Sequence, residues 1–212
     1  MSVPYAPAGL RRHLPRALGA SMYCLTIMLN GKVVCSAGCA DASFIDASVS
    51  GSIFDASPAT LRVAGMKELP DDRSAHVYWV QELALQAGDV LTVTPEDLPS
   101  GSEPASIVPT DSPEYEAEQK EYEDFLQAHV WPQPLPTSNR PTVSLGLTHT
   151  SNGKIKAAIP VGQQHILCSV LWNNHRPRPA RIYARSFSSE QTLEWLRGEI
   201  AQGESLCVEI CA

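Results

Sequence analysis

The chain has 212 residues and a formal net charge of −7, with 23 acidic side chains against 16 lysines and arginines. Such acidity disfavours generic binding to nucleic acid or to anionic membranes, and no apolar stretch is long enough to form a transmembrane helix. We therefore expect a cytoplasmic protein, with residues 1–21 as a disordered N-terminal tail and not as a signal peptide.

Two segments of the chain, residues 22–97 and 141–212, carry similar landmarks in the same order. Landmarks in a fixed order are a good indication of a diverged repeat. We therefore predict a mainly β protein, α+β at its edges, built from two tandem, diverged copies of a small antiparallel β module related by pseudo-twofold symmetry. The alternative is two β-rich halves that share turn chemistry by chance. The matched landmarks are Asn30-Gly31-Lys32 with Asn152-Gly153-Lys154, Ala47-Ser48-Val49 with Cys168-Ser169-Val170, Leu61-Arg62-Val63-Ala64 with Arg181-Ile182-Tyr183-Ala184, Trp79 with Trp195, and Gly88-Asp89-Val90-Leu91-Thr92-Val93 with Gly203-Glu204-Ser205-Leu206-Cys207-Val208.

The first module is predicted to consist of short strands. Leu25, Ile27 and Leu29 place apolar side chains at alternate positions, as in a half-buried strand. The turn that follows is Asn30-Gly31, a strong hairpin signal because both turn residues need positive φ. Further strands are expected at residues 44–54, 61–64, 76–80 and 90–93.

A Pro-rich linker is predicted at residues 98–140, and it contains a helix at residues 113–129. The segment before this helix, residues 95–113, is rich in Pro, Ser and acidic residues and is expected to be a loop. Ser112 suits the N-cap of the helix and Pro113 its first position. Acidic side chains follow in the first turn, where the helix dipole favours them.

One face of this acidic helix is aromatic, because Tyr115, Tyr122 and Phe125 recur at helical spacing. We expect this face to pack across one or both modules. The alternative is a free helix that docks on a partner protein.

The second module repeats the hairpin and strand pattern, with a difference around its matched tryptophan. Residues 188–197 have the composition of a helix, and Ser188 with Gln191 matches a capping box. The segment around Trp79 in the first module has strand composition instead. We therefore predict an extended segment around Trp79 and a short helix around Trp195.

The six cysteines lie inside apolar, strand-like runs, where a free thiol behaves as a small hydrophobic group. We expect them to be reduced. The nearest approach to a metal-ligand pattern is His165 and Cys168 combined with His149 or His175. A metal site needs three or four ligands at fixed geometry, and no closely spaced ligand pair accompanies these residues. No metal and no cofactor are expected.

A basic segment at residues 175–181 combines arginines and prolines and follows Trp172. Arginines among aromatic side chains can grip a phosphate backbone and stack on bases, or dock on an acidic partner surface. The favoured interpretation is a proline-stiffened loop whose arginines pair with the acidic helix of the same chain. The arginines of this loop are Arg176, Arg178 and Arg181.

We expect a non-enzymatic, cytoplasmic protein-binding module, most concretely a bacterial immunity or inhibitor protein whose partner is a toxin or an enzyme. No nucleophile elbow and no phosphate-cradling glycine loop occurs in the sequence. The alternatives are a single-stranded nucleic-acid-binding protein that uses the basic loop, and an enzyme whose site lies where Trp79 and Trp195 face each other. The sequence does not fix the oligomeric state. The predicted binding residues are Arg176, Arg178, Arg181, Trp172, Tyr115, Tyr122 and Phe125.

Overall fold

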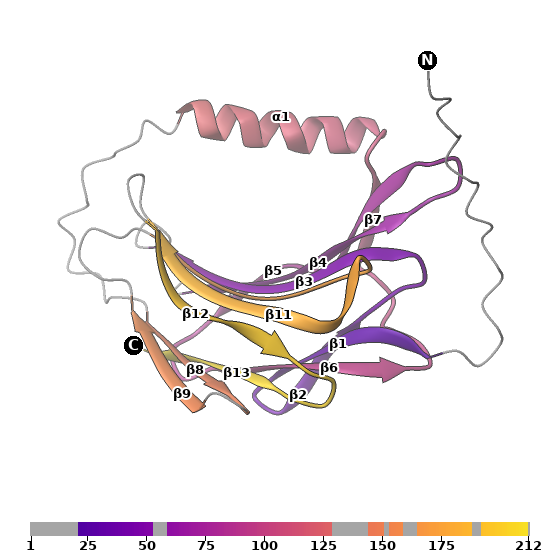
Figure 1. Cartoon of the computed structure of the whole chain (residues 1–212). Helices are drawn as coiled ribbons and strands as arrows, with labels where there is room; N and C mark the ends of the chain where they lie inside the picture. The colour runs from indigo at the N-terminus through magenta and orange to yellow at the C-terminus, as the bar shows by residue number, and fades with distance from the viewer. Residues whose placement is uncertain are drawn as a thin grey trace, which may run out of the picture.

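Two antiparallel β-sheets make up most of the structure, and the prediction of a mainly β protein is confirmed (Figure 1). The computed structural model describes residues 21–52, 59–128, 144–150, 153–158, 165–187 and 192–211. Sheet A contains, in spatial order, β2 (Lys32–Ala37), β1 (Met22–Leu29), β6 (Val90–Leu98), β13 (Leu206–Cys211), β8 (Ser144–His149) and β9 (Gly153–Ala158). Sheet B contains β12 (Thr192–Ile200), β11 (Arg176–Phe187), β10 (His165–Asn173), β3 (Ala42–Ser52), β4 (Ala59–Glu68), β5 (Ser74–Leu85) and β7 (Ser106–Pro109).

Each sheet combines strands from both halves of the chain. In sheet A, β13 pairs with β6, and in sheet B, β10 pairs with β3. The strand order of each sheet is symmetric about its centre when β7 is left out. If β1 is exchanged with β8, β2 with β9, and so on to β6 with β13, each sheet has the same strand order read from its other edge. Buried side chains from both halves, among them Leu61 and Ile182, form one hydrophobic cluster. The core is therefore shared between the halves.

The alternation of side chains along sheet B explains where this core sits. On β11, Ala180, Ile182 and Ala184 are buried, whereas Arg181 and Arg185, at odd-numbered positions, are exposed. Successive side chains of a strand point to opposite faces of the sheet. One face of sheet B therefore contributes to the core, and the other carries polar and charged side chains.

The predicted hairpin turn at Asn30 and Gly31 is confirmed, because both residues have positive φ, 51° and 77°. It joins β1 to β2, whose register pairs Leu29 with Lys32. The second predicted turn joins β8 to β9 and includes Gly153, with φ of 74°. Residues 151–152 of this turn lie outside the described residues, as do residues 1–20 of the tail predicted at residues 1–21.

The predicted helix at residues 188–197 is wrong. Residues 192–200 form strand β12, which pairs with β11 along its length. Trp195 lies in this strand, and its Nε1 donates a hydrogen bond to Ser186 Oγ at 3.1 Å. Cross-strand hydrogen bonding and packing against the sheet outweigh helix propensity, which is a weak preference for a short segment. The extended segment predicted around Trp79 is confirmed as part of β5.

Two segments predicted to be loops contain strand residues. In the first, predicted at residues 95–113, β6 continues to Leu98, and Ser106–Pro109 forms β7 at the edge of sheet B. Proline is tolerated at such an edge, where its missing N–H faces away from the ladder. The second, the basic segment 175–181, is the start of β11 and follows a two-residue turn after β10.

The single helix of the described chain, α1 (Pro113–Ala128), is capped at its N-terminus by Ser112, whose Oγ accepts a hydrogen bond from the Tyr115 N–H at 3.2 Å. Two residues of its first turns contact sheet B. Tyr115 stacks on His76 at 5.2 Å, and Glu118 approaches Tyr78 on β5. Within the described residues, no helix has the length and hydropathy needed to cross a bilayer.

Candidate functional site

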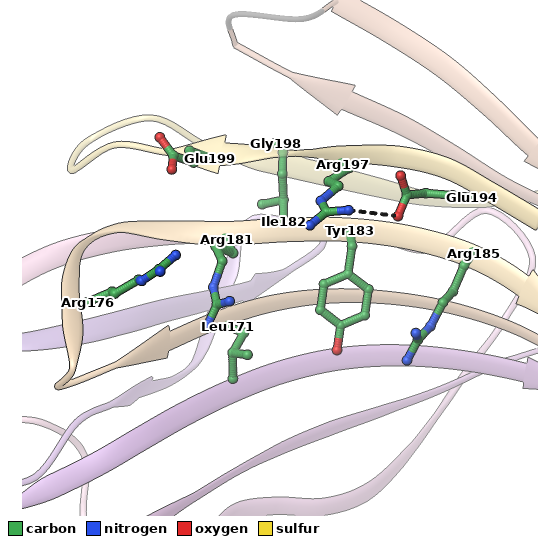
Figure 2. A pocket seen from close by; sticks show the side chains of 10 residues that line it. All are labelled: Leu171, Arg176, Arg181, Ile182, Tyr183, Arg185, Glu194, Arg197, Gly198 and Glu199. Carbon is green, nitrogen blue, oxygen red and sulfur yellow. Dashed lines mark ion pairs between the residues drawn. The ribbon is translucent and has the colours of Figure 1, made fainter.

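The outward face of sheet B carries a group of arginines on β11 and β12. Arg181, Tyr183 and Arg185 occupy alternate positions on β11, and Figure 2 shows their side chains on the same side of this strand. The opposite positions on β12 are Glu199, Arg197 and Glu194, in that order. The alternation of a regular strand thus gathers residues that are two apart in sequence onto one surface.

These side chains surround a pocket of about 470 Å³. Arg176, at the start of β11, and Leu171, on β10, complete its rim on the side away from β12 (Figure 2). Positive charge is in excess, since four arginines face two glutamates. The ten lining residues are Leu171, Arg176, Arg181, Ile182, Tyr183, Arg185, Glu194, Arg197, Gly198 and Glu199.

The arginines of this pocket are only partly neutralised. Arg197 lies 4.0 Å from Glu194, between exposed side chains. The Arg185 guanidinium lies over the Tyr183 ring, 5.1 Å from its centroid, a favourable cation–π distance. Arg176 and Arg181 form no ion pair with any other residue that the structure describes. The pocket therefore has guanidinium groups available for a negatively charged ligand.

A small polar cluster lies beside the pocket, in the middle of sheet B. Ser169 on β10 is buried and donates a hydrogen bond to the Asp46 carboxylate on β3. Burial raises the pKa of Asp46, and the hydrogen bond from Ser169 opposes this rise. Ser169 is also the cross-strand partner of Tyr183. The cluster thus places a carboxyl group close to the arginine surface.

The structure separates the three predicted arginines. Arg176 and Arg181 line the pocket, whereas Arg178 contacts Asp97 on β6 and Gln202. The favoured interpretation, in which this segment pairs with the acidic helix, is therefore wrong for Arg178, whose acidic partner lies in the neighbouring sheet. A bulge between β10 and β11, where the register shifts, places residues 176 and 181 on one surface although their spacing is odd.

The other predicted binding residues lie away from this pocket. Trp172 is buried and stacks on Tyr23, with 5.1 Å between the ring centroids. Tyr115 packs on His76, and Tyr122 is 58% exposed on α1. The Phe125 side chain falls outside the described residues. Of the three aromatic residues whose side chains are described, only Tyr122 is largely exposed.

Sequence reasoning missed Arg197 as part of the pocket. It was hidden by the helix predicted for residues 188–197, because a helix would have separated Arg197 from β11. Tyr183 and Arg185 had a usable signal, since they continue the alternation of Arg181 along a strand. The missing information was which strand pairs with β11.

Two other arrangements that the sequence left open are not found among the described residues. Trp79 on β5 and Trp195 on β12 lie in strands separated by four others in sheet B, so they do not face each other. His165 and Cys168 are three residues apart on β10, an odd spacing that directs them to opposite faces of a strand. In the described part of the chain, no group of three or more His, Cys, Asp or Glu side chains could hold a metal ion.

The three buried thiols, Cys24, Cys35 and Cys168, are not activated as nucleophiles. Burial raises the pKa of Cys24 and of Cys35 to about 11 and that of Cys168 to about 12. A thiol with such a pKa is almost entirely protonated near neutral pH.

Comparison with known proteins gives no match: no protein-family model matches this chain, and neither a curated protein nor a solved structure is significantly similar to it.

Proposed function

We propose that this is a protein-binding module, and that it binds an acidic surface of a partner through the arginine face, defined as Arg176, Arg181, Tyr183, Arg185 and Arg197. The observation that supports this most directly is the presence of Arg176 and Arg181 on one exposed surface without an ion pair among the described residues. Arginine and tyrosine are enriched at protein interfaces and dominate their binding energy.

The distribution of charge supports a protein partner. The chain is acidic overall, with a net charge of −7, yet this face gathers four arginines against two glutamates. A local positive surface on an acidic protein orients an incoming acidic partner and repels other anions elsewhere. The most concrete form of the proposal is a cytoplasmic immunity or inhibitor protein of a bacterium, whose partner is a toxin or an enzyme with an acidic surface.

Charge reversal on the arginine face tests this function. The variant Arg181→Glu with Arg197→Glu, used as bait in an extract of the source cells, should lose a partner that the unchanged chain captures. Arg73→Glu is a matched control, because Arg73 is also exposed and pairs only at the surface with Asp111 at 3.5 Å. Equal capture by all three baits would exclude the arginine face as the binding surface.

A second candidate function is single-stranded nucleic-acid binding by the same face. The observation in its favour is the Arg185 guanidinium over the Tyr183 ring, because arginines and aromatic rings together bind phosphates and stack on bases. A titration with a fluorescent oligonucleotide at several salt concentrations distinguishes the two. An affinity that falls with a clear slope against log salt supports this candidate, and the absence of binding at low salt excludes it.

We also infer that the two halves are diverged copies of one module, with α1 in the linker between them. The cross-strand register supports this. Ser48 pairs directly with Ser169 in sheet B, and Thr92 pairs directly with Cys207 in sheet A. Both pairs join residues that the sequence landmarks match, which is the arrangement that a twofold axis through both sheets requires.

The register also corrects one part of the sequence match. The landmarks align Leu61 with Arg181, but Leu61 is buried and Arg181 is exposed. Arg62 pairs with Ser48, and Tyr183 pairs with Ser169. Exchange of the halves therefore makes Arg62 equivalent to Tyr183, and Leu61 equivalent to Ile182. Leu61 and Ile182 are both buried in the core.

A further inference from the structure

Sheet B has a second hollow on its outward face, of about 380 Å³. The Ser48–Ser169 pair lies between this hollow and the arginine-lined pocket. We call this hollow the first-half hollow, and the arginine-lined pocket the second-half hollow. The first-half hollow is lined by Ser50, Thr60, Leu61, Arg62, Tyr78, Gln81, Glu82 and Glu118.

The two hollows occupy equivalent positions in the sheet. Ser48 and Ser169 pair with each other, so a step of two residues along β3 leads to Ser50 and the same step along β10 leads to Leu171. The neighbouring strands follow the same rule, because Ser50 pairs with Thr60 and Leu171 pairs with Arg181. Four lining residues of each hollow correspond in this way: Ser50 with Leu171, Thr60 with Arg181, Leu61 with Ile182, and Arg62 with Tyr183.

The first-half hollow already receives a helix. Glu118 of α1 is one of its lining residues, and the Tyr78 hydroxyl donates a hydrogen bond to Glu118 Oε2 at 3.5 Å. The Arg62 guanidinium lies over the Tyr78 ring, 5.3 Å from its centroid. An acidic helix thus reaches a hollow in which an arginine covers a tyrosine.

The second-half hollow offers similar chemistry with more positive charge. Arg185 lies over Tyr183 at 5.1 Å, as Arg62 lies over Tyr78. Thr60 and Arg62 of the first hollow are replaced by Arg181 and Tyr183, and Arg197 is added from β12. None of its lining residues belongs to a helix of the described chain. An acidic helix would therefore fit this hollow by charge at least as well as α1 fits the first.

The acidic helix on this molecule that can reach outward is α1 itself. It contains six acidic residues and one lysine. After Glu118, its described side chains are exposed, and Tyr122 keeps 58% of its surface open although it follows Tyr115 and Glu118 on the same helical face. An exposed aromatic ring among carboxylates is a composition that a partner surface rich in arginine can bind.

We propose that the second-half hollow binds helix α1 of a second copy of this chain, with the carboxylates of α1 against Arg176, Arg181 and Arg197. The interaction uses the arginine face that we assign above to protein binding, and it rests on that assignment. It adds a defined occupant, and it implies that self-association and binding of another protein compete for one surface.

Sedimentation velocity on the full chain tests the proposal. At low salt the unchanged chain should self-associate with rising concentration, and high salt should dissociate it, because the contacts are between exposed charges. The variant Arg181→Glu with Arg197→Glu and the variant Glu121→Lys with Asp124→Lys should each weaken self-association by about tenfold or more. An equimolar mixture of the two variants should restore a complex, since the reversed charges are again complementary.

Several controls make the outcome decisive. Arg73→Glu should leave self-association unchanged, and circular dichroism should show the same fold for all variants. If a charge reversal disturbs folding, Arg181→Gln with Arg197→Gln replaces it and should weaken association in the same direction. A chain that stays monomeric at every concentration overturns the proposal, as does self-association that neither reversal affects.

The experiment also distinguishes this proposal from the proposed function. The variant Glu121→Lys with Asp124→Lys leaves the arginine face intact, so it should still capture another protein. Capture of a partner by a chain that does not self-associate would refute only the second-copy occupant. Loss of both in the arginine variant, but of self-association alone in the helix variant, supports both.

Discussion

Ser48 on β3 and Ser169 on β10 are direct cross-strand partners at the centre of sheet B. The strands on either side of this pair come from different halves of the chain, and sheet A has the same arrangement around Thr92 and Cys207. Neither half therefore forms a complete sheet alone. The stability of each half depends on the other through backbone hydrogen bonds in both sheets and through one shared core.

The shared core predicts a single cooperative unfolding transition. Leu61→Ala in the first half and Ile182→Ala in the second half should each lower the free energy of unfolding by about 2–5 kcal/mol, because both side chains are fully buried. Both variants should shift the same transition in urea, followed by circular dichroism and tryptophan fluorescence. Two separate transitions, each sensitive to only one of the variants, would show that the halves unfold independently.

The hairpins and the alternation of the strands could be predicted because they depend on local sequence. Asn30 and Gly31 adopt positive φ as the turn requires, and the apolar residues of β1 and β11 alternate with polar ones. The order of strands depends on contacts between distant segments, for which the sequence has no local signal. The pairing of strands from different halves had one indication in the sequence: two of the matched landmark pairs, Ser48 with Ser169 and Thr92 with Cys207, are direct cross-strand partners.

The candidate site could be predicted only in part, because some of its residues are brought together by the pairing of distant strands. Arg176 and Arg181 lie where a basic surface was expected, whereas Arg178 is directed to Asp97 by the bulge and Trp172 faces the core. A strand with a bulge changes which residues share a face, and the position of a bulge depends on its partner strand. Arg197 joins the site because β12 pairs with β11, a long-range contact that a helical interpretation of its segment excluded.

The Asn30–Asp89 contact predicts a dependence of stability on acid pH. The Asp89 carboxylate accepts hydrogen bonds from Asn30 Nδ2 at 2.8 Å and from the Gln86 N–H at 2.7 Å. The Asn30 contact, followed by the Gln86 contact, holds the pKa of Asp89 below its usual value of 3.8. A carboxyl group with a lowered pKa in the folded state stabilises the protein above the unfolded pKa, and this contribution is lost as the pH falls through the folded pKa.

Asp89→Asn should therefore be less stable than the unchanged chain near neutral pH, and the difference should shrink as the pH falls below about 4. Urea unfolding midpoints at a series of pH values measure it. Asp111→Asn is a matched control, because Asp111 contacts only the exposed Arg73 through its side chain among the described residues. A difference between Asp89→Asn and the unchanged chain that stays constant down to strongly acid pH would contradict this role of the carboxylate.

Burial predicts two classes of cysteine reactivity. Cys24, Cys35 and Cys168 are at most 5% exposed, and burial raises the pKa of each thiol to about 11 or above. Cys39, Cys207 and Cys211 are half-buried, and all six cysteines are free thiols. An alkylating agent must reach the sulfur, and it reacts with the thiolate, so the three half-buried cysteines should be labelled before the three buried ones in the native protein. Burial raises the pKa of Cys39 as well, so for this residue the prediction depends on exposure alone.

Mass spectrometry of peptides after iodoacetamide treatment, with and without denaturant, measures this difference. In denaturant all six sites should react at comparable rates, which also reports whether each thiol was reduced at the start. Prompt labelling of Cys168 in the native protein would show that β10 opens frequently, because Cys168 is almost completely enclosed there.

His149 on β8 is a buried histidine at a position where the other half of the chain has a leucine. It is 2% exposed, and neither Nδ1 nor Nε2 has a hydrogen-bond partner among the residues that the structure describes, although Nε2 lies 3.7 Å from Glu204 Oε2. His149 pairs with Leu206 on β13, and Leu29 pairs with Leu91 on β6. Exchange of the halves relates Leu206 to Leu91, so it places Leu29 at the position equivalent to His149.

A buried polar group without a hydrogen bond costs about 1–3 kcal/mol, and leucine already packs against the core at the equivalent position. His149→Leu should therefore raise the free energy of unfolding by about this amount, measured by urea denaturation at neutral pH. His149→Gln, which keeps polar atoms at the site, is the control and should bring no gain. A loss of stability in His149→Leu would mean that the approach to Glu204 stabilises the fold more than burial of the unpaired ring nitrogens destabilises it. Glu204→Gln would then lower stability to a similar extent.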